Sequence, residues 1–345
     1  MKKAFSRIAD RSQSSAATAA VDLAQLFPGP PNRRSILLKG RFWRRAWLPL
    51  LLLVASVLTI CGSGARFMHD FQLGRPPLAS GDDFFPLPWV YFHLSAFAGG
   101  WSFCLALLSI LLAHEAGHFF YCRKHGIDVT WPYVLPAPTL SGTAGAVIRI
   151  RSRIPSRRAL IEVGIAGPIA GYIVAVPAAV LGMLLSKSTG VYPVPTLLHF
   201  EQPLTITLLD HTLRAIDPGL PAIGHILPHP ILLASWIGFF VTSLNLIPAG
   251  QLDGGHILFA ISPTFHRVMS YAVPVLLLGM GLTLWGGWML WGAILLLPVM
   301  RHPFLPYFPP LTRGHRWLGL LALAMLALTF LPAPFADTGL IHLFR

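Results

Sequence analysis

Long apolar runs constrain the fold of this chain more than any other feature of its sequence. They are Trp47–Cys61, Trp89–Cys122, Ala159–Leu185, Ile231–Ile261, Met269–Trp285, Trp288–Met300 and Trp317–Phe330. Of the 345 residues, 54% are hydrophobic and only 11% are charged, whereas roughly a quarter of a soluble domain is charged. Because a helix crosses the bilayer core with roughly 20 apolar residues, we expect an all-α polytopic membrane protein with about six to seven transmembrane helices.

The basic residues are distributed unevenly between the loops. Residues 1–45, 123–158, 267 and 301–316 hold 21 of the 26 Lys and Arg, and basic loops normally stay on the cytoplasmic side. The sequence thus predicts an integral membrane protein with a cytoplasmic N-terminus. We expect a bacterial inner membrane, with a plastid or other organelle membrane as the alternative. Despite the net charge of +13, no basic face is interleaved with aromatic residues, so no nucleic-acid partner is expected.

The second apolar run contains the pentapeptide His114-Glu115-Ala116-Gly117-His118. Residues four apart share one face of a helix, so His114 and His118 can offer two imidazole nitrogens to one zinc ion. Glu115 lies beside them, where it could take a proton from a bound water molecule. Ionisable groups within a bilayer are costly and usually functional. We therefore predict that His114 and His118 are metal ligands and that Glu115 is the catalytic base.

A second intramembrane carboxylate, Asp253, occurs in a stretch that cannot form one continuous helix. Pro248, Gly250, Gly254 and Gly255 surround it, and broken helices at membrane depth are tolerated where they line a protein-buried or wet cavity. A catalytic zinc normally has three protein ligands and one open position, so Asp253 is the expected third ligand. His256 could also reach a metal, but we favour a supporting or packing role, since a fourth protein ligand would close the open position.

The two motifs together resemble those of the site-2 protease family of intramembrane zinc metalloproteases. The likeness rests on H-E-x-G-H at His114–His118 and on N-x-x-P-x-x-x-L-D-G at Asn245–Gly254. It implies that one zinc ion is bound by His114, His118 and Asp253, that Glu115 is the base, and that Asn245 positions the substrate. The implied function is hydrolysis of peptide bonds in or near transmembrane helices of membrane-protein substrates. The sequence assigns neither the individual substrate nor the oligomeric state.

This interpretation divides the chain into four parts. Residues 1–45 would be a disordered basic cytoplasmic tail, and residues 46–88 the first transmembrane helix with an extracytoplasmic loop. Residues 89–262 would form the catalytic core, and residues 263–345 the C-terminal transmembrane helices. Within the core, Ala146–Ile154 alternates apolar and basic residues as a half-buried strand does. We expect a short β-strand or hairpin there, which either holds an unwound substrate by its edge or serves as a lipid-anchoring basic loop.

Two other function classes would also place ionisable groups in the membrane. An ion- or proton-coupled transporter often has a broken helix, but such proteins usually contain internal repeats and none is found here. A catalytically inactive homologue normally lacks the glutamate or a ligand, whereas Glu115 and all three expected ligands are present. Both classes predict no peptide hydrolysis, which separates them from a protease.

Overall fold

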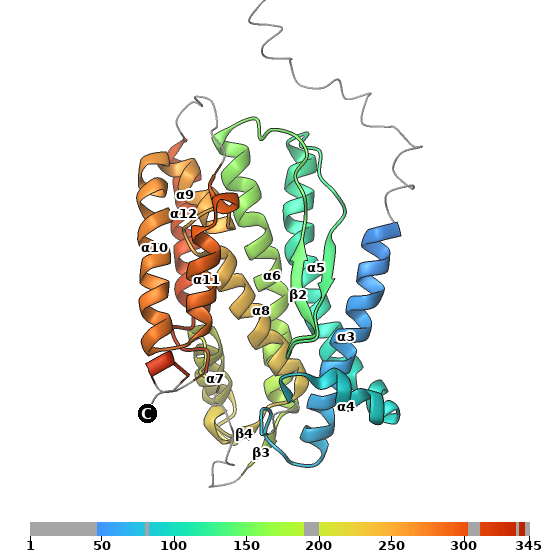
Figure 1. The fold of residues 1–345 in the computed structure, drawn as a ribbon. Coiled ribbons are helices and arrows are strands. Elements are labelled where there is room, and N and C mark those ends of the chain that lie inside the picture. Colours follow the sequence, from blue (N-terminus) through green and yellow to red (C-terminus); the bar gives the residue numbers. More distant parts are fainter. Residues whose placement is uncertain (1–46, 80–82, 190–199, 303–310, 336–337, 342–345) are drawn as a thin grey trace, which may run out of the picture. The chain divides into compact units, whose positions relative to one another are not determined.

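A computed structural model describes most of the chain from residue 47 onward. The described ranges are 47–79, 83–189, 200–302, 311–335 and 338–341. The tail predicted at residues 1–45 lies outside them. Within the described ranges the chain forms a bundle of helices that run up and down side by side (Figure 1). This architecture confirms the predicted all-α class.

Ten α-helices occur in the described residues. They are α3 Trp47–Gln72, α4 Pro86–Phe92, α5 Trp101–Lys124, α6 Arg157–Leu185, α7 Leu204–Ile216, α8 Pro230–Leu246, α9 Asp253–Ile261, α10 Pro263–Thr283, α11 Gly287–Leu296 and α12 Arg313–Thr329. The short 3-10 helices are η4 Leu94–Gly100, η5 Ile223–His225 and η6 Pro298–Met300. The strands are β1 Tyr133–Pro136, β2 Thr143–Val147, β3 Lys187–Ser188 and β4 Ile226–Leu227, and they form the antiparallel pairs β1–β2 and β3–β4.

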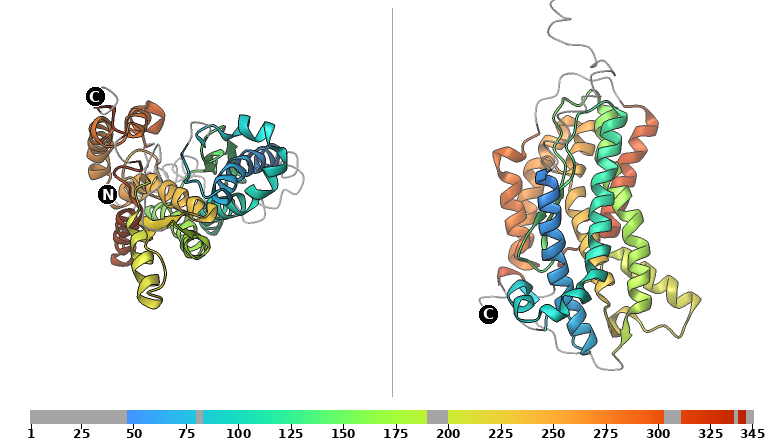
Figure 2. Two further views of the ribbon diagram at one scale, coloured as in Figure 1. Left: turned by 90° about the horizontal axis from the view of Figure 1, so that it is seen from below. Right: turned by 90° about the vertical axis from the view of Figure 1, so that its right-hand side faces the viewer.

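Four helical segments are long and apolar enough to cross a membrane: α3, η4 with α5, α6, and α10. The helices α8, α11 and α12 are shorter, with 17, 10 and 17 residues. They lie in the same bundle as the longer helices (Figures 1 and 2), so the expected six to seven spans are compatible with this arrangement. The amphipathic helix α7 projects sideways from the lower end of the bundle (Figure 2).

Two glycines separate η4 from α5 within the second apolar run, Trp89–Cys122. Gly99 and Gly100 end η4, and α5 begins at the next residue. A Cβ atom on Gly100 would overlap the backbone of Cys61 in α3, so the missing side chain allows α3 and η4 to touch. The first run extends further than expected, because α3 continues to Gln72 with Arg66 and Asp70 buried in its last turns.

The predicted strand exists, but it is shorter and starts earlier than expected. Instead of Ala146–Ile154, β2 covers Thr143–Val147 and pairs with β1, and beyond it only Ile150 forms a single bridge, to Val129. The alternation of apolar and basic residues continues after residue 147. The partner strand β1 reaches only as far as Tyr133, which pairs with Val147. The hairpin descends into the bundle beside α3 (Figures 1 and 2), where Ser56 Oγ donates a hydrogen bond of 3.0 Å to the Val134 carbonyl.

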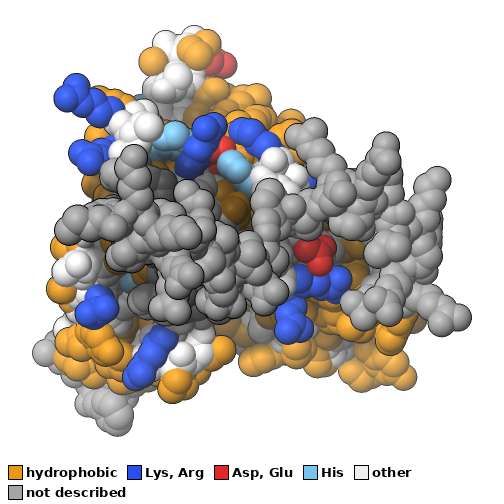
Figure 3. Space-filling model, turned by 90° about the horizontal axis from the view of Figure 1, so that it is seen from above, with side chains coloured by type: hydrophobic (Ala, Val, Ile, Leu, Met, Phe, Trp, Pro, Cys, Tyr) orange, Lys and Arg blue, Asp and Glu red, His pale blue; other side chains and the backbone are white. Residues whose placement is uncertain are grey.

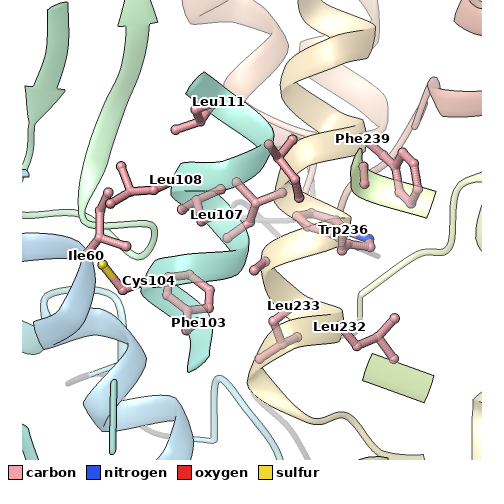
Figure 4. Close-up of a cluster of buried hydrophobic side chains, with 14 of the residues drawn as sticks. Ile60, Phe103, Cys104, Leu107, Leu108, Leu111, Leu232, Leu233, Trp236 and Phe239 are labelled. Carbon is pink, nitrogen blue, oxygen red and sulfur yellow. The ribbon is translucent and has the colours of Figure 1, made fainter. Parts of the chain in front are cut away.

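The largest apolar core lies between α3, α5 and α8 (Figure 4). Phe103 and Leu107 of α5 are fully buried in it, as is Phe239 of α8. Burial of apolar side chains between helices holds α5 at a fixed distance from α8. That spacing matters because α5 carries the H-E-x-x-H motif and α8 leads to Asp253.

Charged side chains gather at the end of the bundle where α5 ends and α6 begins (Figure 3). There Glu162 accepts hydrogen bonds from Arg158 at 2.7 Å, His125 at 2.9 Å, Lys124 at 3.3 Å and His315 at 3.3 Å. Glu162 lies in the second turn of α6, because the helix begins at Arg157 and not at residue 159. Ion pairs to the end of α5 and to α12 therefore stabilise this carboxylate.

We expect Glu162→Gln to destabilise the bundle. Hydrogen bonds to a charged group contribute about 1.5–3 kcal/mol each, and the neutral amide cannot pair with four basic partners. The apparent melting temperature in detergent should fall for Glu162→Gln and stay unchanged for Glu201→Gln, since Glu201 is exposed. Equal melting temperatures for Glu162→Gln and wild type would show that this cluster does not join the helices.

Candidate metal centre

Helix α5 presents His114 and His118 on one face, one turn apart. Their ring centroids are 5.0 Å apart, and the residues are only 4% and 6% exposed. Glu115, between them, is 5% exposed. Two imidazoles and a carboxylate on an otherwise apolar helix are thus enclosed by protein.

Asp253 reaches the two imidazoles from a distant part of the chain. As the first residue of α9, it places its Oδ2 atom 3.2 Å from His114 Nε2 and 3.2 Å from His118 Nε2. One ligand atom from each of the three residues lies within 4.8 Å of the other two. Two nitrogen donors and one carboxylate oxygen suit a catalytic zinc, so the donor set fits the expected metal.

A backbone carbonyl fixes the orientation of one imidazole. His118 Nδ1 lies 2.8 Å from the Val163 carbonyl oxygen of α6. The ring must donate its Nδ1–H to this acceptor, so Nε2 is the ring nitrogen that faces Asp253. Metal-binding histidines are commonly oriented by such a second hydrogen bond.

Glycines on α6 make room for both histidines. A Cβ atom on Gly167 would overlap the His118 ring, and one on Gly171 would lie 3.2 Å from His114 Nδ1. Gly164, one turn earlier, faces the start of α9, where a Cβ atom would lie 3.3 Å from the Asp253 carbonyl. Small residues at these positions form a face that allows close helix packing. The structure shows that this face packs directly on the imidazoles.

The break between α8 and α9 brings Asn245 to the same place. The chain turns at Gly250, whose φ of +59° favours glycine, and a side chain on Gly254 would overlap the Leu246 carbonyl. Asn245 lies in the last turn of α8, just before this break, and its Nδ2 atom is 3.3 Å from His114 Nε2. The end of α8 and the start of α9 therefore place both polar residues beside α5.

Glu115 points toward the hairpin. The backbone N–H of Ile148, the residue after β2, faces its carboxylate. The end of β2 therefore lies next to the expected base. The sequence predicts neither this contact nor the contact of His118 with the Val163 carbonyl. Both involve backbone groups, which nearly every residue carries.

His256 lies outside the cluster of His114, His118 and Asp253. Its Nδ1 atom lies 3.1 Å from His302 Nε2. This position agrees with the expectation that His256 is not a ligand of the same metal.

The close contact at Gly167 generates a test of the metal centre. Gly167→Ala should displace the His118 ring and lower zinc affinity by about 10-fold or more, as supporting residues of metal sites commonly do. Gly171→Ala should have a smaller effect, since its added methyl group would only touch His114. Zinc retained after dialysis against a chelator, measured by mass spectrometry, would show the difference.

Gly279→Ala in α10 is the matched control, because nothing lies within 4 Å of its added Cβ atom. It should retain zinc like the wild type. Equal zinc retention in Gly167→Ala and Gly279→Ala would contradict a metal centre built against α6.

Comparisons with known proteins agree with these observations. The family model of peptidase family M50 matches residues 102–284. The chloroplastic "Probable zinc metalloprotease EGY1" of Arabidopsis thaliana is 30% identical over 237 residues, which cover 66% of this chain and 42% of the relative. The chloroplastic "Probable zinc metalloprotease EGY2" of Arabidopsis thaliana is 28% identical over 233 residues, which cover 67% of this chain and 41% of the relative. The rice (Oryza sativa) "Probable zinc metalloprotease EGY3, chloroplastic" is 28% identical over 238 residues, which cover 65% of this chain and 37% of the relative.

This chain therefore spans about two fifths of the length of these relatives. The family match covers more than half of the chain and includes both motifs. The chain belongs to peptidase family M50, the site-2 protease family that the two motifs indicated.

Proposed function

We propose that the protein is an intramembrane zinc metalloprotease that hydrolyses peptide bonds in or near transmembrane helices of membrane proteins. One observation carries this proposal: α5 and α9 bring His114, His118 and Asp253 together beside Glu115, within a bundle of apolar helices. Buried ionisable groups at membrane depth are costly and point to a function. Family membership supports the same reaction.

His114, His118 and Asp253 would hold one zinc ion. When bound, zinc lowers the pKa of a coordinated water molecule and polarises a carbonyl group. The Val163 carbonyl binds His118 Nδ1 and so directs Nε2 at the site. Asp253, a carboxylate, supplies negative charge that favours a cation over an empty cluster.

Glu115 is the group placed to move protons. It would accept a proton from the attacking water and pass it to the leaving amine. The Ile148 N–H, which faces this carboxylate, would help to orient it. Asn245 would donate an Nδ2–H to the oxygen of the scissile peptide, where negative charge develops in the transition state.

The substrate would enter as an extended segment along β2. Helical peptide bonds are shielded by their own hydrogen bonds, so a transmembrane helix must unwind before hydrolysis. β1 pairs with one edge of β2, and Val147 near its end is 49% exposed. The other edge of β2 would bind the unwound substrate backbone by strand addition. Ile148, which follows β2, would then place this backbone beside Glu115.

The charge distribution supports one orientation in the membrane. The ends of α5, α10 and α12 that carry Arg123, Arg267 and Arg313 lie at the same end of the bundle. We propose that this end and the N-terminus are cytoplasmic. A bacterial inner membrane is our proposed location; the relatives named above are chloroplastic, and membrane fractionation of the native source distinguishes the two.

Glu115→Gln tests the reaction directly. The variant should bind zinc as the wild type does, because Glu115 is not one of the three proposed ligands. Its cleavage of a model transmembrane substrate should fall by about 10²–10⁴-fold, the usual contribution of a general base. Removing zinc from the wild type with a chelator should abolish cleavage, and adding zinc should restore it.

The same experiment separates the competing functions. A transporter would contain little zinc and cleave nothing, and an inactive homologue would bind zinc and cleave nothing. Wild-type protein that carries zinc but leaves every model transmembrane substrate intact would contradict the protease proposal.

Ile148→Pro tests the role of the strand. Proline removes the N–H that reaches Glu115 and distorts the end of β2, so cleavage should be lost while zinc is retained. Ile148→Ala is the matched control, because it keeps the N–H and should retain most of the activity. Normal turnover by the proline variant would remove the strand from the mechanism.

A further inference from the structure

A row of three arginines follows β2 and has no role in the proposed reaction. Arg149, Arg151 and Arg153 occupy alternate positions, and all three are exposed. Ile148 and Ile150, between and before them, pack against the apolar cluster at the end of α5 and the start of α6. The segment therefore has one apolar face, which lies on these helices, and one basic face, which does not.

This segment is extended and paired along one edge only. The N–H of Thr130 donates a hydrogen bond of 3.0 Å to the Arg149 carbonyl, and the N–H of Arg151 donates one of 2.8 Å to the Asp128 carbonyl. Neighbouring residues of a strand direct their backbone groups to opposite edges. The N–H of Ile148 accordingly points to the other edge, where it faces the carboxylate of the proposed base. A substrate strand added at that edge would lie beside the arginine row.

The row spans the distance from the proposed base to the end of the bundle. Lys124, the last residue of α5, lies nine residues beyond Glu115, about 13 Å along the helix. Arg153 lies four residues beyond Arg149, and an extended chain covers about 13 Å in four residues. This segment rises beside α5 toward the end of the bundle (Figure 1). A backbone bound next to Glu115 would therefore pass all three arginines as it leaves the membrane.

Neighbouring carboxylates do not neutralise this row. Within the described part of the chain, no ion pair joins any of the three arginines to an Asp or Glu, and Glu162 at the same end pairs with other basic residues. Arg149 follows the residue that faces Glu115, so it lies near the depth of the proposed base. Charged side chains at such a depth usually mark a substrate path. This depth favours a protein ligand over a lipid head group.

We propose that Arg149, Arg151 and Arg153 bind acidic side chains of the substrate. The protease would then select membrane proteins whose transmembrane segment continues into an acidic stretch at this end of the bundle. The inference rests on the proposed function and names its substrate class. Side chains directly opposite each other on paired strands lie about 4.5–5.5 Å apart, where opposite charges attract and like charges repel.

The row would select substrates largely by exclusion. The end of the bundle that carries it is the one proposed to be cytoplasmic, and most membrane helices carry Lys or Arg at their cytoplasmic flank. Three arginines repel such a flank, whereas they attract an acidic one. Repulsion of the wrong partner is a common source of specificity. Most transmembrane segments would therefore be rejected even if they can unwind beside β2.

The test uses full-length protein in uncharged detergent and model substrates that share one transmembrane segment. Three alternate glutamates, glutamines or lysines flank this segment. Two sets carry them before or after the segment, because either chain direction can add to a strand edge. In one set, wild type should cleave the glutamate substrate about 10-fold more efficiently than the glutamine substrate, through a lower KM, and the lysine substrate least efficiently.

Changing the arginines should change this order. Arg149→Gln, Arg151→Gln and Arg153→Gln combined should cleave the three substrates with equal efficiency. Arg149→Glu, Arg151→Glu and Arg153→Glu combined should reverse the order, so that the lysine substrate is cleaved most efficiently. Arg267→Glu is the control, because Arg267 is exposed on α10 at the same end of the bundle. It should keep the order of the wild type.

Equal cleavage of all three substrates by wild type in both sets overturns the inference and leaves the proposed function intact. An unchanged order in the combined glutamine variant also overturns it. If the arginines bind lipid instead, adding anionic phosphatidylglycerol to the micelles would change cleavage of all three substrates alike, with no preference among them.

If wild type cleaves no substrate, the proposed function fails, and binding of labelled substrates to Glu115→Gln tests the arginine row separately. Tighter binding of the glutamate substrate, lost when the three arginines are also replaced by glutamine, supports the row. Equal binding of the three substrates overturns it.

Discussion

The contact between α5 and α6 at His118 and Gly167 is the constraint on which the structure depends. A polar cluster at membrane depth is stable only if protein groups surround and orient it. The glycine face of α6 lets the helices approach until the Val163 carbonyl reaches His118 Nδ1. Because this contact fixes the orientation of the His118 ring, Asp253 must lie on the side of the ring that carries Nε2 to bind the same ion. The break between α8 and α9 supplies that carboxylate.

Much of this arrangement could be predicted from residue types. The spacing of His114 and His118 predicts a shared helix face, and Gly250 with Pro248 predicts the break before Asp253. Gly99 and Gly100 mark the start of α5. Each of these is a local rule, in which the residue itself restricts the backbone or the direction of a side chain.

The features that could not be predicted depend on distant backbone groups. The Val163 carbonyl and the Ile148 N–H carry no sequence signal, and pairing of β2 with β1 ended earlier than the alternating pattern indicated. The four basic partners of Glu162 lie at the end of α5, on α6 and on α12, and only the fold brings them together. His256 and His302 are 46 residues apart, and nothing in their spacing links them.

The central claim is that two imidazoles of α5 and the carboxylate of α9 bind the same ion. X-ray absorption spectroscopy of protein loaded with a single equivalent of zinc measures this coordination directly. The account predicts two imidazole nitrogens and oxygen ligands in the wild type, and loss of this coordination in Asp253→Asn. An unchanged spectrum and unchanged zinc affinity in Asp253→Asn would contradict it.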